Sequence, residues 1–523
     1  MYRLLLLCLL MLAGAVRAAP DAATLADLAG DDFDARIAAI QNLGVAGDEE
    51  SRRILQALED DALAVAGGRL VIVEGADVVD AATGAPIKPA PDYDAITVNN
   101  RVRQALAGAK AAIDIFSPDR KTRLAAAHTL GDASSERLAP VFDKALATEQ
   151  DPEVRKLLVL SSARLNLGAA DPALRLKAVQ ALSESADPAV RTLLVERLAD
   201  EQDADVRTAI EVASRAVDRR IGVAEGVGTL FTGLSLGSIL LLAALGLAIT
   251  YGVMGVINMA HGELLMVGAY STYLVQGLFR QHLPGLLDWY VVAAVPVAFL
   301  VAALVGVLME RTVIRFLYGR PLESLLATWG LSLVLIQAAR VIFGPQNVEV
   351  ANPEWMSGGV ALVGDVVLPW NRIVIIGFAA FVLVLIWLLM QKTRLGMFVR
   401  AVTQNRVMAG CVGVPTARVD TLAFALGAGV AGLGGVALSQ IANVGPAMGQ
   451  GYIVDAFLVV VVGGVGQLAG AVWAALGLGL ISKVLEGWAG AVIAKILVLV
   501  FIIVFIQKRP QGLFAMKGRF VES

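Results

Sequence analysis

Apolar and polar residues follow two different patterns along this chain. Up to about residue 226, apolar residues recur at helical spacing between charged ones, whereas from about residue 228 they form long runs. These runs lie near residues 229–252, 262–279, 290–309, 323–343, 373–391, 419–440, 453–486 and 490–507. Most of them reach the roughly 20 apolar residues that a membrane-spanning helix needs. The pattern predicts an all-α protein, in which a helical domain outside the membrane precedes a polytopic membrane bundle over residues 228–510.

The run 453–486 is longer than one crossing and is interrupted by GGVGQLAG. We expect it to split into two short helices, which brings the bundle to about nine crossings. Four glycines in or beside the interruption are candidates for close helix packing, because small residues let helix backbones approach each other in lipid. They are Gly463, Gly464, Gly466 and Gly470, of which the last two have the GxxxG spacing.

A short motif recurs within residues 19–220. DPEVR at 151, DPALR at 171, DPAVR at 187 and DADVR at 203 each precede apolar residues at helical spacing. Asp suits the N-cap because its side chain accepts a backbone hydrogen bond, and Pro suits the first turn. The distance from 151 to 187 indicates a two-helix unit of 36 residues. This pattern resembles HEAT-type repeats, whose helix pairs stack into an α-solenoid with a continuous core.

Residues 67–99 interrupt this helical pattern. They include RLVIVEG and several Gly and Pro residues, a composition that is typical of strands and turns. We therefore expect a small strand-bearing insertion in the helical domain.

The first 18 residues have the features of a signal peptide. Arg3 precedes an apolar stretch from Leu4 to Val16, and small residues follow up to Ala18. About 13 apolar residues are too few to span a membrane, so an uncleaved anchor is the weaker interpretation. We expect the following domain, residues 19–220, to be exported. Cleavage would leave Cys411 as the single cysteine, so no internal disulfide could form.

The distribution of charge agrees with this division. Of 89 charged residues, 61 lie in the first 226 positions, with 26 basic and 35 acidic side chains, so nucleic-acid binding is not indicated. The remainder has 17 basic residues, of which twelve fall in 310–322, in 391–418 and after 507. The positive-inside rule places these segments in the cytoplasm. We expect a multi-pass protein of the bacterial inner membrane, with a periplasmic N-terminal domain and a cytoplasmic tail, 511–523.

The stretch GVINMAHGELLMVGAY, residues 255–270, places three polar side chains in an otherwise apolar region. Asn258, His261 and Glu263 fall between the first two spans, where a polar group is costly and usually faces a cavity or a partner. They are candidates for a polar constriction or gate on a substrate pathway. A hydrogen-bonded cap that joins two helices is the competing interpretation.

Asp455, in GYIVDAFLVVVVGGVGQ, is a further candidate for the substrate pathway. Its carboxylate could accept a hydrogen bond from a solute. Alternatively it could pair with Lys483 or Lys495 and hold short helices together, since a charge at the centre of a span costs about 2.5–3.5 kcal/mol on insertion scales.

Four motifs together resemble the permeases of the branched-chain amino acid class of ATP-driven importers, the ABC importers. They are GVINMAHGELLMVGAY at 255, TRLGMFVRAVTQNRVMAGCVGV at 393, VVGGVGQLAGAVWAALGLGL at 461 and RPQGLF at 509. More narrowly, the chain resembles the urea permease of that class, whose members carry a long exported N-terminal extension. Asp455 fits urea permeases, because amino-acid permeases of the class often have a basic residue at this place.

The resemblance implies that the chain is the membrane half of an importer. Its expected partners are a second permease subunit, two cytoplasmic ATPase subunits and an exported solute-binding protein. The chain lacks GxxxxGK[ST], so ATP is used by partner subunits and no cofactor is expected on this chain. By similarity, Arg400 to Gly413 would form a coupling helix that contacts an ATPase, with Arg400, Asn405 and Gly413 as key residues. The positive-inside rule alone explains the arginines but not the turn AGCVGVP.

Other classes of protein fit parts of the sequence. A branched-chain amino acid permease differs from this interpretation only in its solute. A self-powered secondary transporter fits the hydrophobicity but not the coupling-like loop, and a membrane-anchored solenoid scaffold leaves the permease motifs unexplained. An enzyme is not indicated, because the membrane region has no Ser, His and Asp set and no metal-binding cluster.

Overall fold

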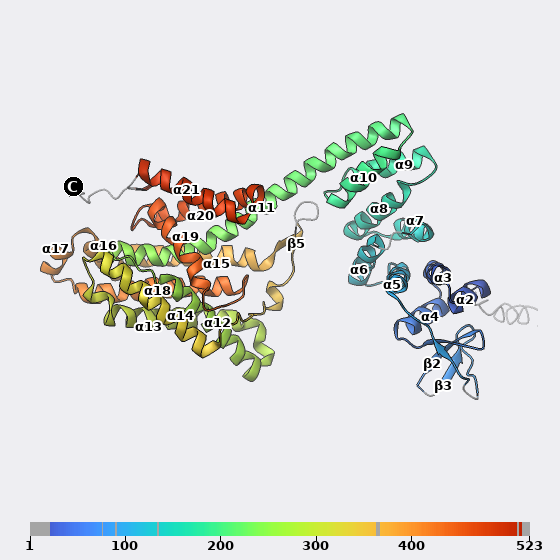
Figure 1. Cartoon of the computed structure of the whole chain (residues 1–523), viewed down its shortest axis with the longest axis horizontal. Helices are drawn as coiled ribbons and strands as arrows, with labels where there is room; N and C mark the ends of the chain where they lie inside the picture. The colour runs from blue at the N-terminus through green and yellow to red at the C-terminus, as the bar shows by residue number, and fades with distance from the viewer. Residues whose placement is uncertain are drawn as a thin grey trace, which may run out of the picture. The chain divides into compact units, whose positions relative to one another are not determined.

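The computed structural model describes residues 21–75, 77–88, 91–132, 135–361, 367–509 and 512–514. The predicted signal peptide, 1–18, and most of the predicted tail, 511–523, lie outside these residues. The chain divides into two units, Met1–Ile221 and Gly222–Ser523, which we call the N-terminal unit and the membrane unit. Figure 1 shows the helices and strands of both units.

Helices dominate the N-terminal unit, and several begin at the predicted caps. Asp151, Asp171 and Asp187 each accept a hydrogen bond from the backbone N–H two residues ahead, at 2.8–3.0 Å, with proline in the first turn. These predicted N-caps are confirmed. The helices are α2 (Ala22–Ala29), α3 (Phe33–Ala46), α4 (Glu49–Glu59), α5 (Asn100–Asp114), α6 (Arg120–Asp132), α7 (Ala139–Thr148), α8 (Pro152–Asn166), α9 (Pro172–Leu182), α10 (Pro188–Asp200) and the start of α11 (Ala204–Met254), with a 3-10 turn η1 (Glu136–Leu138).

The contacts of this unit repeat over a longer distance than the sequence motif does. Arg123 donates to Glu149 and Arg175 donates to Glu201, and the second pair follows the first by 52 positions. Further contacts recur at this offset: Arg155 with Leu146 and Arg207 with Leu198, and the caps Asp151 and Asp203. These contacts favour a three-helix unit over the predicted two-helix unit of 36 residues. The Asp-Pro motif marks any helix start, so it does not identify one position of the repeat.

A small antiparallel sheet interrupts the helices of the N-terminal unit. Its strands are β1 (Leu63–Ala66), β2 (Arg69–Glu74), β3 (Asp77–Asp80) and β4 (Asp94–Ala95), in the order β3-β2-β1-β4. The predicted strand-bearing insertion is confirmed, and the prediction of an all-α chain is wrong to this extent. The physical reason is local, because β-branched Val71 and Ile72 favour a pleated strand and bury their side chains.

The membrane unit contains seven helices that are long and apolar enough to span a membrane, among the residues that the structure describes. They are α11, α13 (Tyr290–Thr312, preceded by the 3-10 turn η2, Pro284–Trp289), α14 (Pro321–Phe343), α15 (Trp370–Lys392), α18 (Thr416–Ser439), α20 (Leu468–Ala489) and α21 (Ala491–Lys508). The remaining elements are α12 (His261–His282), η3 (Ile314–Phe316), η4 (Glu354–Met356), β5 (Gly359–Ala361) paired with β6 (Val367–Pro369), α16 (Arg394–Gln404), α17 (Arg406–Cys411) and α19 (Met448–Gly463).

The expected nine crossings correspond to these seven helices together with α12 and α19. The run 453–486 is divided into α19 and α20, as predicted. However, α19 has only 16 residues, and α12 has Glu263 in its first turn and Arg280 in its last, so neither qualifies as a candidate span by length and composition. Among the described residues, the number of candidate membrane-spanning helices is therefore seven.

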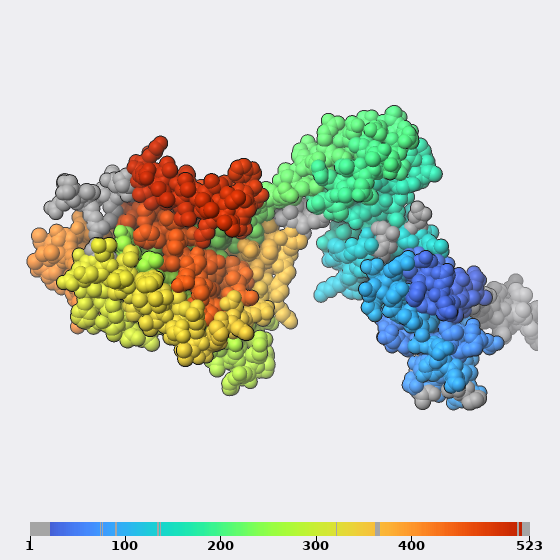
Figure 2. Space-filling view, in the orientation of Figure 1, coloured from blue at the N-terminus to red at the C-terminus, as the bar shows by residue number. Residues whose placement is uncertain are grey.

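The core of the membrane unit is built around α18. This helix is rich in glycine and alanine, most of its residues are buried, and it packs against α12 and α13. A Cβ atom on Gly268 would meet the backbone of Gly432, and one on Gly435 would meet the backbone of Leu265. Small residues thus allow α12 and α18 to pack at backbone distance. Figure 2 shows α20 and α21, in red, on the surface of the same unit.

Contacts between helix termini define two ends of the membrane unit. At one end, Arg311 from the end of α13 donates to Thr421 in the first turns of α18, at 3.2 Å. At the other, the Tyr290 hydroxyl from the start of α13 donates to Gln440, which follows α18, at 3.2 Å. The first end, which we call the basic end, carries the predicted cytoplasmic loops 310–322 and 391–418. The orientation of this end in a membrane remains a prediction.

Candidate functional site

The polar segment 255–263 lies at the basic end, between two buried helices. Helix α11 ends at Met254, Gly255 has a φ of 64°, and α12 begins at His261. Asn258, His261 and Glu263 are exposed by only 2%, 0% and 1%. All three are therefore removed from solvent and need partners within the protein.

Part of their hydrogen-bonding capacity is used locally. The Asn258 Oδ1 atom accepts from the Ala260 N–H at 3.1 Å, which closes a turn directly before α12. The His261 Nε2 atom lies 3.0 Å from the Ala243 carbonyl of α11, and because a carbonyl only accepts, Nε2 carries the proton. These bonds support the interpretation of the segment as a cap that joins two helices.

One polar atom on each of these three side chains has no hydrogen-bond partner within the described part of the chain. Among the described residues, the Asn258 Nδ2, His261 Nδ1 and Glu263 Oε2 atoms are buried and have no hydrogen-bond partner. With Nε2 protonated, a neutral His261 has an acceptor at Nδ1, so the three atoms are one donor and two acceptors when Glu263 is ionised. Native proteins rarely leave such groups unpaired, so they identify the segment as a candidate site for a polar solute or water.

Helix α14 supplies two partners of the segment that sequence reasoning missed. The Ser332 hydroxyl donates to Glu263 Oε1 at 2.9 Å, and the Thr328 hydroxyl accepts from the Met259 N–H at 3.1 Å. Ser332 and Thr328 each lie 69 positions after the residue that they contact. No local pattern in the sequence relates residues so far apart, and Ser and Thr are common in spans.

Asp455 lies elsewhere in the membrane unit. The Lys495 Nζ atom of α21 is 3.5 Å from its Oδ2 atom, while Lys483 pairs with Glu486 at 2.6 Å. A cavity of about 370 Å³ between α11, α19, α20 and α21 is lined by Leu236, Leu458, Ser482, Glu486, Asp455 and Lys495, among others. Among the residues that the structure describes, no hydrogen bond or ion pair joins Asp455 to Asn258, His261 or Glu263.

The predicted coupling residues lie on and around two short helices at the basic end. Arg400 is exposed on α16, and its guanidinium donates to the Met390 carbonyl. Asn405 caps α17, where its Oδ1 atom accepts from the Met408 N–H at 2.9 Å. Gly413 has a φ of 87°, which a residue with a Cβ atom adopts only with strain, and it forms the predicted turn.

A cluster of polar side chains next to these helices was not predicted. It comprises Glu310 and Arg311 at the end of α13, Tyr318 before α14, Arg406 at the start of α17, and Asp420 and Thr421 on α18. We call it the basic-end cluster. Glu310 is 3% exposed and Asp420 is fully buried, so both carboxylates depend on their partners within the cluster.

The four predicted packing glycines occupy the junction of α19 and α20. A Cβ atom on Gly463 would lie 2.5 Å from the carbonyl carbon of Gly470, so these two glycines allow the helices to touch. Gly464 and Gly466 form the turn between them, with φ values of 97° and 76°. Gly466 also lies against Gly252 of α11, because a Cβ atom on Gly252 would meet its Cα atom at 2.9 Å.

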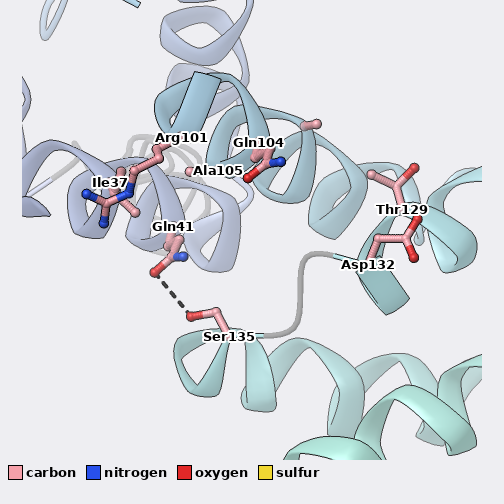
Figure 3. A pocket seen from close by; sticks show the side chains of 9 residues that line it. Ile37, Gln41, Arg101, Gln104, Ala105, Thr129, Asp132 and Ser135 are labelled. Carbon is pink, nitrogen blue, oxygen red and sulfur yellow. Dashed lines mark hydrogen bonds between the residues drawn. The ribbon is translucent and has the colours of Figure 1, made fainter. Parts of the chain in front are cut away.

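The N-terminal unit has a shallow pocket of about 410 Å³ between α3, α5, α6 and the turn before η1 (Figure 3). The Ser135 hydroxyl donates to Gln41 Oε1 across it at 3.2 Å. Arg101 lines the pocket and also pairs with Asp34 at 2.7 Å, with both side chains mostly exposed. The polar groups of the pocket are thus solvated or paired, and it carries none of the residues that the sequence singled out.

Multiple apolar helices, a core of small residues and polar groups buried among the candidate spans are the features of a multi-pass membrane protein. The family model described as "Branched-chain amino acid transport system / permease component" matches residues 229–506, more than half of the chain. The chain belongs to this family, so it is a transport subunit and not an enzyme. The ATPase of such importers is a separate subunit, and residues before 229 lie outside the match.

Three relatives show how far the similarity extends. The high-affinity branched-chain amino acid transport system permease protein LivH of Salmonella typhimurium is 28% identical over 292 residues, which are 54% of this chain and 94% of LivH. The corresponding protein BraD of Pseudomonas aeruginosa is 30% identical over 256 residues, 48% of this chain and 83% of BraD. A probable LivH of Methanocaldococcus jannaschii is 26% identical over 244 residues, 45% of this chain and 73% of that protein.

Proposed function

We propose that this chain is a permease subunit of an ATP-driven importer of urea. The observation that carries the choice of solute is the unpaired set at Asn258, His261 and Glu263, one donor and two acceptors in a buried position. Urea has one carbonyl acceptor and several N–H donors, so it can satisfy such a set without bringing a net charge into the spans. Residues 255–270 contain no Lys or Arg to compensate the carboxylate of an amino acid.

A branched-chain amino acid is the second candidate solute. It is favoured by the names of the relatives LivH and BraD. It is also favoured by the cavity at Asp455, where the carboxylate and the Lys495 ammonium could pair with the two charges of a zwitterion.

Uptake into proteoliposomes separates the two solutes. The complete importer, with its binding protein and ATP, should accumulate labelled urea and not labelled leucine. Replacing Glu263 with Leu should reduce urea uptake about tenfold, because a hydrogen bond to a charged group is lost, whereas Glu263→Gln should retain most of it. Ser271→Ala is the matched control on α12, since among the described residues that hydroxyl bonds to the Val267 carbonyl of its own helix and to no other side chain. Leucine uptake by the wild-type complex would overturn the proposal for urea.

We also assign the coupling role to α16, α17 and the turn at Gly413. The proposal is supported by the exposure of Arg400 and by the position of these helices at the basic end. Replacing Arg400 and Asn405 together with Ala should leave the protein inserted in the membrane but weaken ATPase binding and abolish uptake. Normal ATP-dependent uptake by the double variant would contradict this role.

The partners and topology in this proposal follow the sequence predictions. The chain would assemble with a second permease, two ATPases and an exported binding protein in the bacterial inner membrane. Its N-terminal unit, which we interpret as a HEAT-like solenoid, would be periplasmic and serve as a docking or stabilising module, and the C-terminus would be cytoplasmic. Protease added to intact spheroplasts should remove the N-terminal unit, and full protection would reverse the topology.

A membrane-anchored scaffold is the competing function of another class, in which the N-terminal unit does the work. It predicts that ATPase subunits do not purify with the chain. It also predicts that a chain truncated before α11 loses its function, whereas the importer proposal predicts residual uptake by the membrane unit.

A further inference from the structure

The basic-end cluster lies between the proposed coupling helices and the polar segment 255–263. We propose that it transmits movement of α17 to this segment, with Arg406 and Tyr318 as positioning residues. The inference rests on the proposed importer function and deepens it. It assigns individual roles to Arg406, which lies within the coupling stretch that the resemblance implies, and to Tyr318, which lies outside the four motifs.

Arg406 links α17 to α18. Its Nη1 atom donates to Asp420 Oδ1 at 3.1 Å, and its Nη2 atom donates to Asp420 Oδ2, so the pairing is bidentate. Its guanidinium also lies 4.8 Å from the centre of the Tyr318 ring. Because Asp420 is fully buried, separating the pair would leave an uncompensated charge at a cost of several kcal/mol. Arg406 is therefore expected to move together with Asp420 and Tyr318 and not to detach from them.

Tyr318 links this pair to the end of α11. Its hydroxyl donates to Glu310 Oε1 at 3.1 Å and lies 3.4 Å from the Met254 sulfur. Met254 is the last residue of α11 and directly precedes the polar segment. A displacement of the Tyr318 ring by Arg406 therefore reaches the start of that segment through two contacts.

A second route runs through α14. Tyr318 lies just before the first residue of α14, Pro321, and the same helix carries Thr328 and Ser332. Their hydroxyls bond to the Met259 N–H and to Glu263. Both routes from Tyr318 therefore end on the segment 255–263.

The remaining members of the cluster, Thr421 and Arg311, contact the buried carboxylate of Glu310 and compensate its negative charge. Thr421 donates to Glu310 Oε2 at 2.9 Å, and the Arg311 Nε atom lies 3.7 Å from the same oxygen. Both carboxylate oxygens thus have partners without any bound ligand. This arrangement favours a mechanical link over an ion-binding site, because each oxygen of Glu310 already contacts a donor of the cluster.

Two conservative variants test the link in the complete complex, purified through a tag on this chain and placed in proteoliposomes. Tyr318→Phe keeps the ring that Arg406 contacts but removes the hydroxyl. Arg406→Lys keeps the charge but loses the bidentate and planar contacts. Tyr318→Phe should leave ATPase association and ATP hydrolysis unchanged while urea taken up per ATP hydrolysed falls about tenfold, a typical size for coupling between sites. Arg406 belongs to the proposed coupling helix α17, so Arg406→Lys is compared with wild type only in the urea taken up per ATP hydrolysed, which should fall by a similar factor. Arg320→Lys is the control, since Arg320 forms an exposed pair with Glu323.

Wild-type uptake per ATP in Tyr318→Phe would overturn the inference, whatever the behaviour of Arg406→Lys. A fall in uptake that only follows a fall in membrane abundance would also overturn it, because a purely structural role predicts that result. Failure of the importer proposal is distinguishable from either outcome, since the wild-type complex would then show no ATP-dependent uptake.

Discussion

The two units of this chain hold their helices together in opposite ways. In the N-terminal unit, aliphatic side chains such as Leu158 and Leu194 fill the core, and arginine–carboxylate pairs link successive helices. In the membrane unit, glycine backbones face each other, as between Gly268 and Gly432, and polar side chains are buried among the spans. Burial of large apolar side chains stabilises contact in water but gains little in lipid, where close backbone packing replaces it.

The comparison also explains where charge is placed. Exposed and half-exposed pairs are frequent in the N-terminal unit, whereas the buried carboxylates of the basic-end cluster and Glu263 sit at or near the spans of the membrane unit. A carboxylate buried among membrane spans costs more free energy than an exposed one, so we expect these carboxylates to have a functional role. Variants that introduce bulk, remove an ion pair or change pH should therefore affect the two units differently.

The largest effect is expected from bulk at the backbone contact of α12 and α18. Gly268→Leu would place side-chain atoms against the Gly432 backbone, which cannot yield as a flexible side chain does. We expect a loss of at least about 3 kcal/mol and little folded protein in the membrane. Gly277→Leu is the matched control on the same helix, since a Cβ atom there meets nothing within 4 Å. Equal membrane abundance of the two variants would contradict this account of the packing.

In the N-terminal unit, the contact expected to be most sensitive to substitution is the ion pair of Arg175 and Glu201. Two hydrogen bonds of 2.7–2.8 Å join the two side chains. Both side chains are at most 9% exposed, so Arg175→Met should cost about 3 kcal/mol by leaving a buried carboxylate. Arg191→Met should cost less than about 1 kcal/mol, because its pair with Asp218 is about half exposed. Hydrogen exchange of α9 and α10 in the full chain measures the loss of stability in each variant. Similar protection in the two variants would contradict the predicted difference in cost.

The same pair predicts a dependence on pH. Hydrogen bonds from Arg175, assisted by the Asp203 N–H and Arg197, lower the pKa of Glu201 from 4.5 to about 2 despite its burial. Because the folded pKa is below the unfolded one, this stabilisation is complete above about pH 4.5 and is lost as the pH falls towards 2. The difference in unfolding free energy between wild type and Glu201→Gln should therefore shrink between pH 5 and 3. A difference in unfolding free energy that does not depend on pH over that range would show that ionisation of Glu201 is not the source of the stabilisation.

The smallest effect is expected at Asp455, whose partner Lys495 is 3.5 Å away and about half exposed. Asp455→Asn should keep membrane abundance, because the amide still accepts a hydrogen bond. If Asp455 belongs to the substrate pathway, Asp455→Lys should reduce urea uptake more than abundance. If the ion pair only holds α19 to α21, abundance and uptake should fall together, and wild-type uptake by Asp455→Lys would exclude the pathway role.

Local features of the fold were predictable and distant pairings were not. The Asp-Pro caps, the strands at Val71 and Ile72, and the division of 453–486 each follow from residues adjacent in sequence. The 52-residue repeat was missed although EQDPEVR at 149 and EQDADVR at 201 share five of seven residues at this offset, because each was counted as one more helix start. The contacts that recur with it, such as Arg175 with Glu201, have no signal in the sequence. Sequence identified the segment around Glu263 as polar, but not Ser332, its partner 69 positions later. Which contacts form is decided by tertiary packing, so the basic-end cluster had no sequence signal.

Purification of the full chain from its native membrane tests the central claim, that it is a permease subunit driven by separate ATPases. A tag on the chain should bring down a second permease and two ATPase subunits, and the complex should accumulate urea only when ATP and the binding protein are supplied. The Arg400 and Asn405 double variant should lose the ATPases while the second permease remains bound. Purification without any ATPase, together with solute uptake that needs no ATP, would contradict the account.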